Sequence, residues 1–148
     1  MSPDDSPLLF RYPIRNVRKA ELRKFLDDVV QRIANGNGIT CLITDDRELR
    51  RLNRQFRGKD YATDVLSFPS EGGGEIAISI DRAAAQAAER GHSVADELRI
   101  LILHGVLHLS GMDHETDSGE MAEVEANWRR RLKLPEGLIE RAHRKVSA

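Results

Sequence analysis

The chain has 148 residues, of which 40% are hydrophobic and 32% are charged, and its net charge is −1. This length and composition fit one soluble globular domain with its own core, and no apolar run approaches the ~18 residues of a membrane span. Because the protein as a whole is not basic, any binding of nucleic acid has to depend on a local patch of cations.

Hydrophobic periodicity and turn residues predict the elements in chain order. They are a strand at 8–12, a helix at 17–34, a strand at 39–43, a helix at 46–56, strands at 65–68 and 75–80, an alanine-rich helix from 81 to 91, a histidine-bearing helix opening at 93, and a helix at 117–132.

Several side chains are expected to set the ends of these elements. Asp45 and Asp81 are predicted to cap the helices that follow them, and Ser93 with Asp96 forms a weaker version of the capping box. Three glycines in residues 70–74 predict a mobile loop between two strands. The residues expected to face inward from the second helix are Leu49, Leu52 and Phe56.

The order of elements predicts an α+β fold, a single domain over residues 1–148 with a small, mostly four-stranded sheet and helices packed on it. Residues 1–7 and 135–148 are expected to be disordered. The one cysteine, Cys41, lies in an apolar run and is interpreted as a core residue of a protein in a reducing compartment. The acidic N-terminus lacks the features of a signal peptide, so a cytoplasmic location is expected.

Three of the five histidines fall within eleven residues, as His104, His108 and His114. Two residues four apart on a helix lie on the same face, and Gly111 can take a left-handed conformation that ends the helix and returns the chain. Three converging imidazoles with a fourth position open are the ligand set of a catalytic zinc site, here on a buried helix and the loop after it. The alternative is two core histidines bonded to backbone and one surface histidine. His92 and His143 are interpreted as surface residues.

The histidine spacing matches that of the metzincin zinc proteases, but the residue that serves as their general base is replaced by Gly105. Glycine cannot take a proton. The sequence therefore argues against peptide hydrolysis, unless a carboxylate from elsewhere acts as the base.

A stripe of arginines forms the second candidate feature. Four of them share one face of the helix at 46–56, and further cations follow, which could bind a phosphate backbone. The alternative is an ordinary solvated helix face. The candidate RNA contacts are Arg47, Arg50, Arg51, Arg54 and Lys59. Arg57, at the end of this helix, can point into a cleft, or else form a salt bridge with Asp60 or Asp64.

The motif from His104 to His114, together with segments 53–60, 63–69 and 74–79, resembles the YbeY family of bacterial endoribonucleases over about residues 39–125. The resemblance implies an α+β domain with one zinc ion on the three motif histidines. It also implies a single-strand-directed endoribonuclease that matures the 3′ end of small-subunit (16S) ribosomal RNA and acts in ribosome quality control. RNA, the ribosome and ribosome-assembly proteins are the implied partners, and the family's functionally important arginine corresponds to Arg57.

The hypothesis that follows is a zinc site beside an arginine that holds the scissile phosphate. Asp113 either orients an imidazole or caps the following turn. The attacking group, water or the RNA 2′-OH, and the general base stay open. The competing readings are a zinc-stabilised ribosome assembly factor without catalysis and, less favoured, a zinc peptidase.

Overall fold

The structure is a computed structural model that describes residues 7–136, 138, 139 and 141. Within this part of the chain, nine elements follow one another. They are β1 (Leu8–Phe10), α1 (Lys19–Ile33), β2 (Gly38–Thr44), α2 (Asp46–Arg57), β3 (Val65–Ser70), β4 (Gly73–Ser79), α3 (Ile80–Arg90), α4 (Val94–Leu109) and α5 (Glu120–Arg131).

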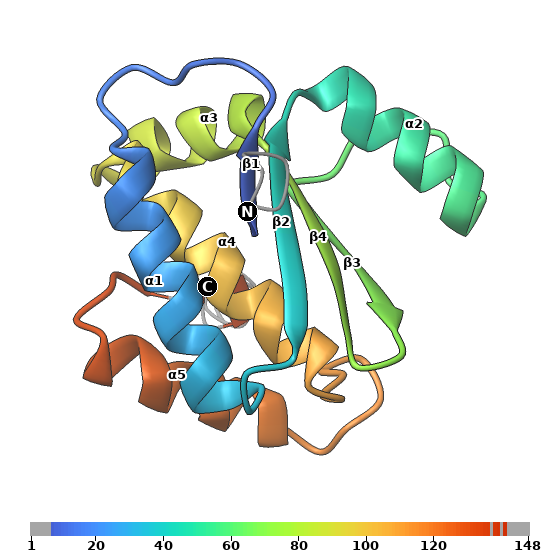
Figure 1. The fold of residues 1–148 in the computed structure, drawn as a ribbon, viewed down its shortest axis with the longest axis vertical. Coiled ribbons are helices and arrows are strands. Elements are labelled where there is room, and N and C mark those ends of the chain that lie inside the picture. Colours follow the sequence, from blue (N-terminus) through green and yellow to red (C-terminus); the bar gives the residue numbers. More distant parts are fainter. Residues whose placement is uncertain (1–6, 137, 140, 142–148) are drawn as a thin grey trace.

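The four strands form one mixed sheet in the order β1-β2-β4-β3. β1, β2 and β4 run parallel, and β3 pairs antiparallel with β4 as a hairpin at one edge. Helices α1 and α4 lie against one face and α5 packs beyond them, while α2 lies on the other face (Figure 1). The predicted α+β class and the four-stranded sheet with helices packed on it are confirmed.

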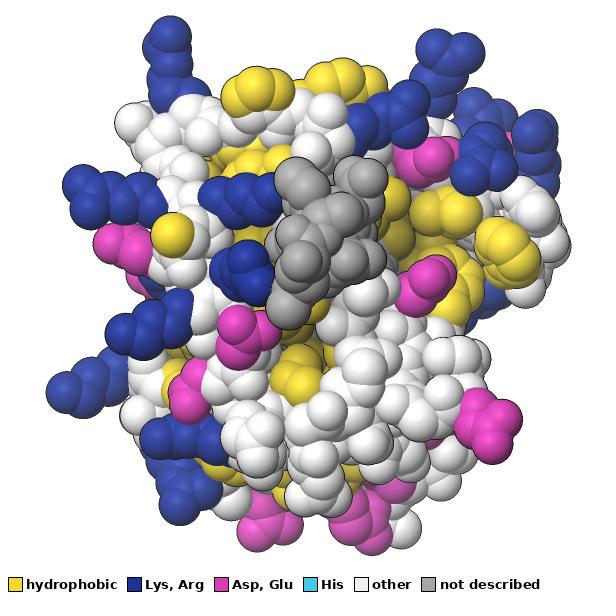
Figure 2. Space-filling model, in the orientation of Figure 1, with side chains coloured by type: hydrophobic (Ala, Val, Ile, Leu, Met, Phe, Trp, Pro, Cys, Tyr) yellow, Lys and Arg dark blue, Asp and Glu magenta, His cyan; other side chains and the backbone are white. Residues whose placement is uncertain are grey.

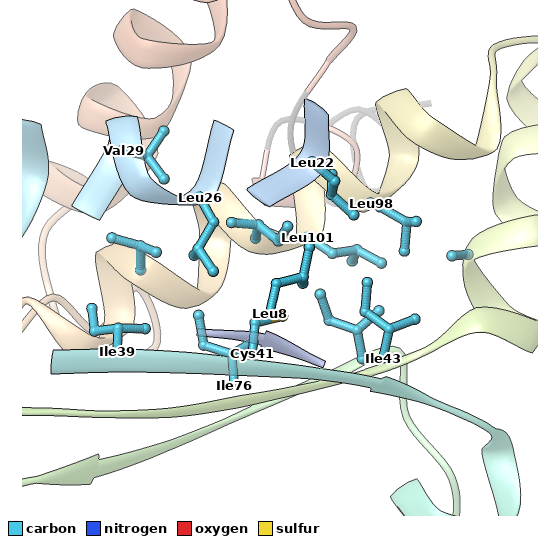
Figure 3. Close-up of a cluster of buried hydrophobic side chains, with 14 of the residues drawn as sticks. Leu8, Leu22, Leu26, Val29, Ile39, Cys41, Ile43, Ile76, Leu98 and Leu101 are labelled. Carbon is cyan, nitrogen blue, oxygen red and sulfur yellow. The ribbon is translucent and has the colours of Figure 1, made fainter. Parts of the chain in front are cut away.

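The main core fills the space between the sheet and helices α1 and α4, as Figure 3 shows. α1 contributes Leu22, Leu26 and Val29, which recur at the spacing of one helix face. From the sheet, Cys41 is fully buried, and burial raises the pKa of its thiol to about 12. The interpretation of Cys41 as a core residue is therefore confirmed.

Helix α4 is buried on nearly every side, as its apolar sequence predicts. Its approach to the sheet depends on Gly105. A Cβ atom built on this glycine would lie 2.9 Å from Cδ1 of Ile76 on β4. The absence of a side chain at this position therefore lets α4 lie close against β4.

The glycines expected to form a mobile loop are instead part of the β3–β4 hairpin, because the strands continue to Ser70 and from Gly73. A Cβ on Gly73 would lie 1.9 Å from the carbonyl oxygen of Gly38, and one on Gly74 would lie 2.6 Å from that of Phe68. Gly73 and Gly74 allow backbones to approach closely and belong to β4. The loop predicted at 70–74 is therefore only a turn at Glu71 and Gly72. Pro69 also lies inside β3, which an edge strand tolerates.

Two predictions about α2 and α3 also need correction. Phe56 was expected to face inward, but it is 60% exposed and meets Phe68 edge-on at the rim of the sheet. α3 is capped by Ser79, whose hydroxyl accepts from the Arg82 amide, and not by Asp81. The Asp81 carboxylate accepts from the Asp46 amide instead, so it joins the starts of two helices. The caps Asp45 and Ser93 are confirmed.

The described residues Leu138 and Ile139 pack in a hydrophobic cluster, although disorder was expected from residue 135. Ile139 and Arg141 are buried, and Arg141 donates two hydrogen bonds of 2.8 Å to Glu97 of α4. Glu97 also accepts from His92 at 2.6 Å, so His92 is half-buried and not the surface residue expected. Residues 1–6 and 142–148 lie outside the described residues, and His143 is one of them. Among the helices that are described, none is long and apolar enough to cross a membrane.

Candidate metal centre

Three histidine side chains converge at the C-terminal end of α4. His104 and His108 lie one turn apart, the first buried and the second half-buried. The helix ends at Leu109, and Gly111, with φ +101°, turns the chain so that His114 returns to the other two rings. The ring centroids lie 4.7 to 5.4 Å apart. The predicted convergence of the three rings is confirmed.

The donor set fits a metal ion. One ligand atom from each ring lies within 4.8 Å of the others. The Nε2 atoms of His104 and His108 are 3.1 Å apart, close to the roughly 3.3 Å edge that Zn–N bonds of about 2.0–2.1 Å give in a tetrahedron. Nδ1 of His114 is buried and has no hydrogen-bond partner among the described residues. Burial, with smaller effects from the other two rings, lowers the pKa of His108 and so favours the neutral form that binds metals.

A carboxylate that the sequence analysis missed contacts this group. Oε2 of Glu125, on α5, lies 2.7 Å from Nδ1 of His104, and both side chains are buried. The two residues are 21 positions apart, and Glu125 occupies an otherwise ordinary charged helix. The available signal was its place on the inward face with Met121, four residues earlier, where a charged residue calls for a partner.

Gly105 explains why the metzincin base is missing. The glycine faces the side chain of Ile76, with three of its carbon atoms 2.9 to 3.1 Å from the position of a Cβ. A glutamate here would require the Ile76 side chain or the helix to shift. The position that carries the base in zinc peptidases is therefore used for packing in this fold.

The histidines open onto a cleft of about 550 Å³ between the end of α2, β3 and the loop after α4. Arg57 lines the same cleft, and its Nη2 donates to the carbonyl of Ser67 at 3.3 Å. Within the described residues, Arg57 forms no salt bridge with Asp60 or Asp64. Asp60 pairs with Arg50 instead, and Asp64 accepts from Gln86 and from the Val65 amide. The cleft is therefore lined both by the Arg57 guanidinium and by three imidazoles from a distant part of the chain.

Asp113 caps the turn after α4. Its Oδ1 accepts from the Glu115 amide at 3.1 Å, and its backbone carbonyl accepts from Thr116 and Asp117. The carboxylate is exposed at the cleft. The contacts of Asp113 are those of a residue that caps a turn, one of the two roles considered for it. The carboxylate that contacts an imidazole is that of Glu125.

The arginine stripe lies mostly outside the cleft. Arg47, Arg50, Arg51 and Arg54 line a separate depression beside Tyr12, whereas Lys59 lines the histidine cleft. Arg50 makes two hydrogen bonds to Asp60, and Arg51 pairs with Glu48, so acidic side chains lie among the cations over α2 (Figure 2). The stripe is thus partly neutralised by its own neighbours.

The sequence pattern of the family described as "Endoribonuclease YbeY" matches residues 12–133. The chain belongs to this endoribonuclease YbeY family. It is 54% identical over 142 residues to the endoribonuclease YbeY of Solibacter usitatus, covering 95% of this chain and 97% of that protein. It is 50% identical over 137 residues to that of Koribacter versatilis, covering 90% of each. The family resemblance seen in the motifs is confirmed.

The fold of this YbeY-family chain is also similar to a solved structure, that of the Thermotoga maritima protein TM1509 in solution. The TM-score is 0.58 at 29% sequence identity, and the match covers 82% of this chain and 84% of the other. The described fold and the family assignment therefore agree.

Proposed function

We propose that this YbeY-family protein is a zinc-dependent endoribonuclease that cuts single-stranded RNA. The observation that supports this most directly is the meeting of three imidazole donors with Arg57 across one open cleft. The cleft also holds the cation Lys59, and a guanidinium group can contact a phosphate through two parallel hydrogen bonds.

In this proposal His104, His108 and His114 hold one zinc ion. Zinc bound by three imidazoles with an open position acts as a Lewis acid that polarises a phosphoryl oxygen and makes water more acidic. Other divalent ions also bind imidazole, so the identity of the metal is part of the proposal.

Arg57 binds the scissile phosphate and stabilises the charge that grows on it. Its position follows from the fold, because α2 ends at Arg57 and Gly58 takes a left-handed conformation (φ +68°) that stops the helix beside β3. The bond to the Ser67 carbonyl leaves the other guanidinium nitrogens for a phosphate. Lys59 adds a second cation to the same cleft.

The proposed substrate is the 3′ end of small-subunit (16S) ribosomal RNA, cut in the cytoplasm during ribosome maturation and quality control. Ribosome-assembly proteins are the proposed partners. The proposed substrate, location and partners follow from membership of the family and not from the geometry of the cleft. We propose that the arginines of α2 make only auxiliary contacts with RNA, because Arg50 and Arg51 already have acidic partners. These arginines are Arg47, Arg50, Arg51 and Arg54.

The chemical ends of the products distinguish the two attacking groups. Attack by the RNA 2′-OH leaves a 2′,3′-cyclic phosphate and a 5′-OH, whereas attack by water leaves a linear phosphate on one of the two ends. Mapping these ends on a single-stranded RNA assigns the nucleophile.

The proposal is tested with two substitutions and one control. His114→Ala should lose zinc and cleavage together. Arg57→Ala should keep zinc but lose about 10²–10³ in cleavage rate, the usual cost of removing one group that stabilises developing charge. Arg23→Ala, an exposed arginine on α1, is the matched control and should change neither. Unchanged cleavage by both site variants would refute the proposal. Normal RNA binding with no cleavage by the wild type would favour the assembly factor.

A further inference from the structure

The environment of His104 differs from that of the other two rings in the cluster. Its Nδ1 atom is 2.7 Å from Oε2 of Glu125, and the exposed fractions of the two side chains are 8% and 1%. Its other nitrogen, Nε2, faces His108 at 3.1 Å. The carboxylate therefore lies on the far side of the imidazole from the other donors.

The second oxygen of Glu125 is occupied as well. Oε1 accepts from the backbone amide of Ile139 at 2.9 Å, and both groups are buried. A carboxylate only accepts hydrogen bonds, so each of its two partners has to be a donor. The proton of the His104 ring therefore belongs on Nδ1, which leaves the lone pair on Nε2 toward the cluster.

We propose that Glu125 is a positioning residue for the metal site. It selects the tautomer of His104 and holds the ring so that Nε2 meets the metal ion. Through the Ile139 amide, it also connects the C-terminal segment to the site. The inference rests on the metal site of the proposed function. Carboxylates that hold a ligating histidine in this way typically change metal affinity by about 10–100-fold when they are removed.

A purely structural role is the competing explanation. Glu125 could serve only to satisfy the Ile139 amide and to tie the C-terminal segment to α5. Its removal would then lower the stability of the metal-free protein without a specific effect on the ring of His104 or on metal affinity.

Glu125→Gln separates the two explanations, because the side chains are nearly the same size but glutamine has one acceptor and one donor group. If its oxygen accepts from Ile139, its NH₂ group faces Nδ1 of His104. That nitrogen then has to accept, and the ring proton moves to Nε2, where it blocks metal binding. The matched control is Glu123→Gln, an exposed residue of the same helix.

Two measurements complete the test. Nitrogen chemical shifts of the His104 ring in metal-free protein report the tautomer, and chelator competition gives the zinc dissociation constant. We expect Nδ1–H in the wild type and in E123Q, and Nε2–H in E125Q with zinc affinity about 10–100-fold weaker. If E125Q does not fold, the test depends on the tautomer of His104 in the wild-type protein. An Nε2–H tautomer there overturns the inference.

The outcomes separate this inference from the proposed function. Zinc affinity in E125Q equal to that of the wild type overturns the positioning role and leaves the metal site standing. A wild-type protein that binds no zinc overturns the proposed function first and the inference with it.

Discussion

Gly105→Ala provides a direct test of how closely α4 lies against the sheet. In an exposed helix interior, the change would stabilise the protein by about 1 kcal/mol through helix propensity. Here the new Cβ would lie 2.9 Å from Cδ1 of Ile76 and 3.1 Å from both of its Cγ atoms, closer than carbon atoms normally approach. Overpacking of a core costs about 1–3 kcal/mol. The packing cost therefore offsets or exceeds the propensity gain, and we expect a net loss of about 0–2 kcal/mol.

The assay is equilibrium unfolding by denaturant, with Ile76→Val to complete a double-mutant cycle. Ile76→Val alone removes the closest carbon, Cδ1, and should cost about 0.5–1.5 kcal/mol as a core truncation. In the Gly105→Ala background the same truncation relieves the clash, so it should cost less or stabilise. A coupling free energy of at least about 0.5 kcal/mol is expected for residues in direct contact.

Two results would refute this reasoning. One is a Gly105→Ala protein that is more stable than the wild type by the full propensity gain. The other is a cycle that is additive within about 0.3–0.5 kcal/mol. Either would mean that α4 has room for a side chain at this position, and the missing peptidase base would then need another explanation.

Three further predictions concern Arg57, Asp45 and Glu97. Arg57→Lys keeps the charge but loses the planar fork, so cleavage should fall about tenfold or more at unchanged zinc content, measured by metal analysis and RNA cleavage. Asp45→Ala removes the cap on the Glu48 amide and should cost about 1 kcal/mol of unfolding free energy with zinc affinity unchanged. Burial raises the pKa of Glu97, but hydrogen bonds from Arg141 and His92 outweigh it and the pKa is lowered. The stabilisation by Glu97 is therefore complete above about pH 4.3 and is lost as pH falls through the lowered pKa. Glu97→Gln should cost about 3–5 kcal/mol at pH 7 by leaving Arg141 unpaired, and unfolding curves should show a smaller difference in acid.

Local patterns in the sequence were sufficient for most of the fold. Apolar periodicity, caps and turn residues located the five helices α1 to α5 of the described residues, and the run of apolar residues around His104 indicated that α4 is buried. The wrong predictions concern residues whose conformation or burial is set by tertiary contacts. The glycines at 73 and 74 look like a loop, but backbone atoms of other strands approach them closely. Phe56 fits an inward helix face, but its ring contacts only the edge of the Phe68 ring on the edge strand β3 and stays 60% exposed.

The histidine cluster was predictable for a similar reason, since all three histidines lie within one helix and the turn after it. Spacing alone brings His104 and His108 to one face, and Gly111 returns His114. Glu125 was not predictable, because its contact with His104 depends on how α5 packs against α4. The same holds for the burial of Arg141, whose partner Glu97 lies 44 positions earlier in the chain. His92 contacts the same carboxylate from five residues away.

Ser67 connects the packing of α4 to the position of Arg57. Its carbonyl accepts from the Arg57 guanidinium, and its hydroxyl is 3.5 Å from the carbonyl of Gly105. The arginine and the histidine helix therefore meet the same residue of β3 from two sides. A larger residue at Gly105 would push α4 away from β3 and β4, and would carry His104 and His108 away from Arg57. The absence of a peptidase base at position 105 and the place of Arg57 in the cleft of the three histidines are thus both linked to one feature, a histidine helix that lies directly on the sheet.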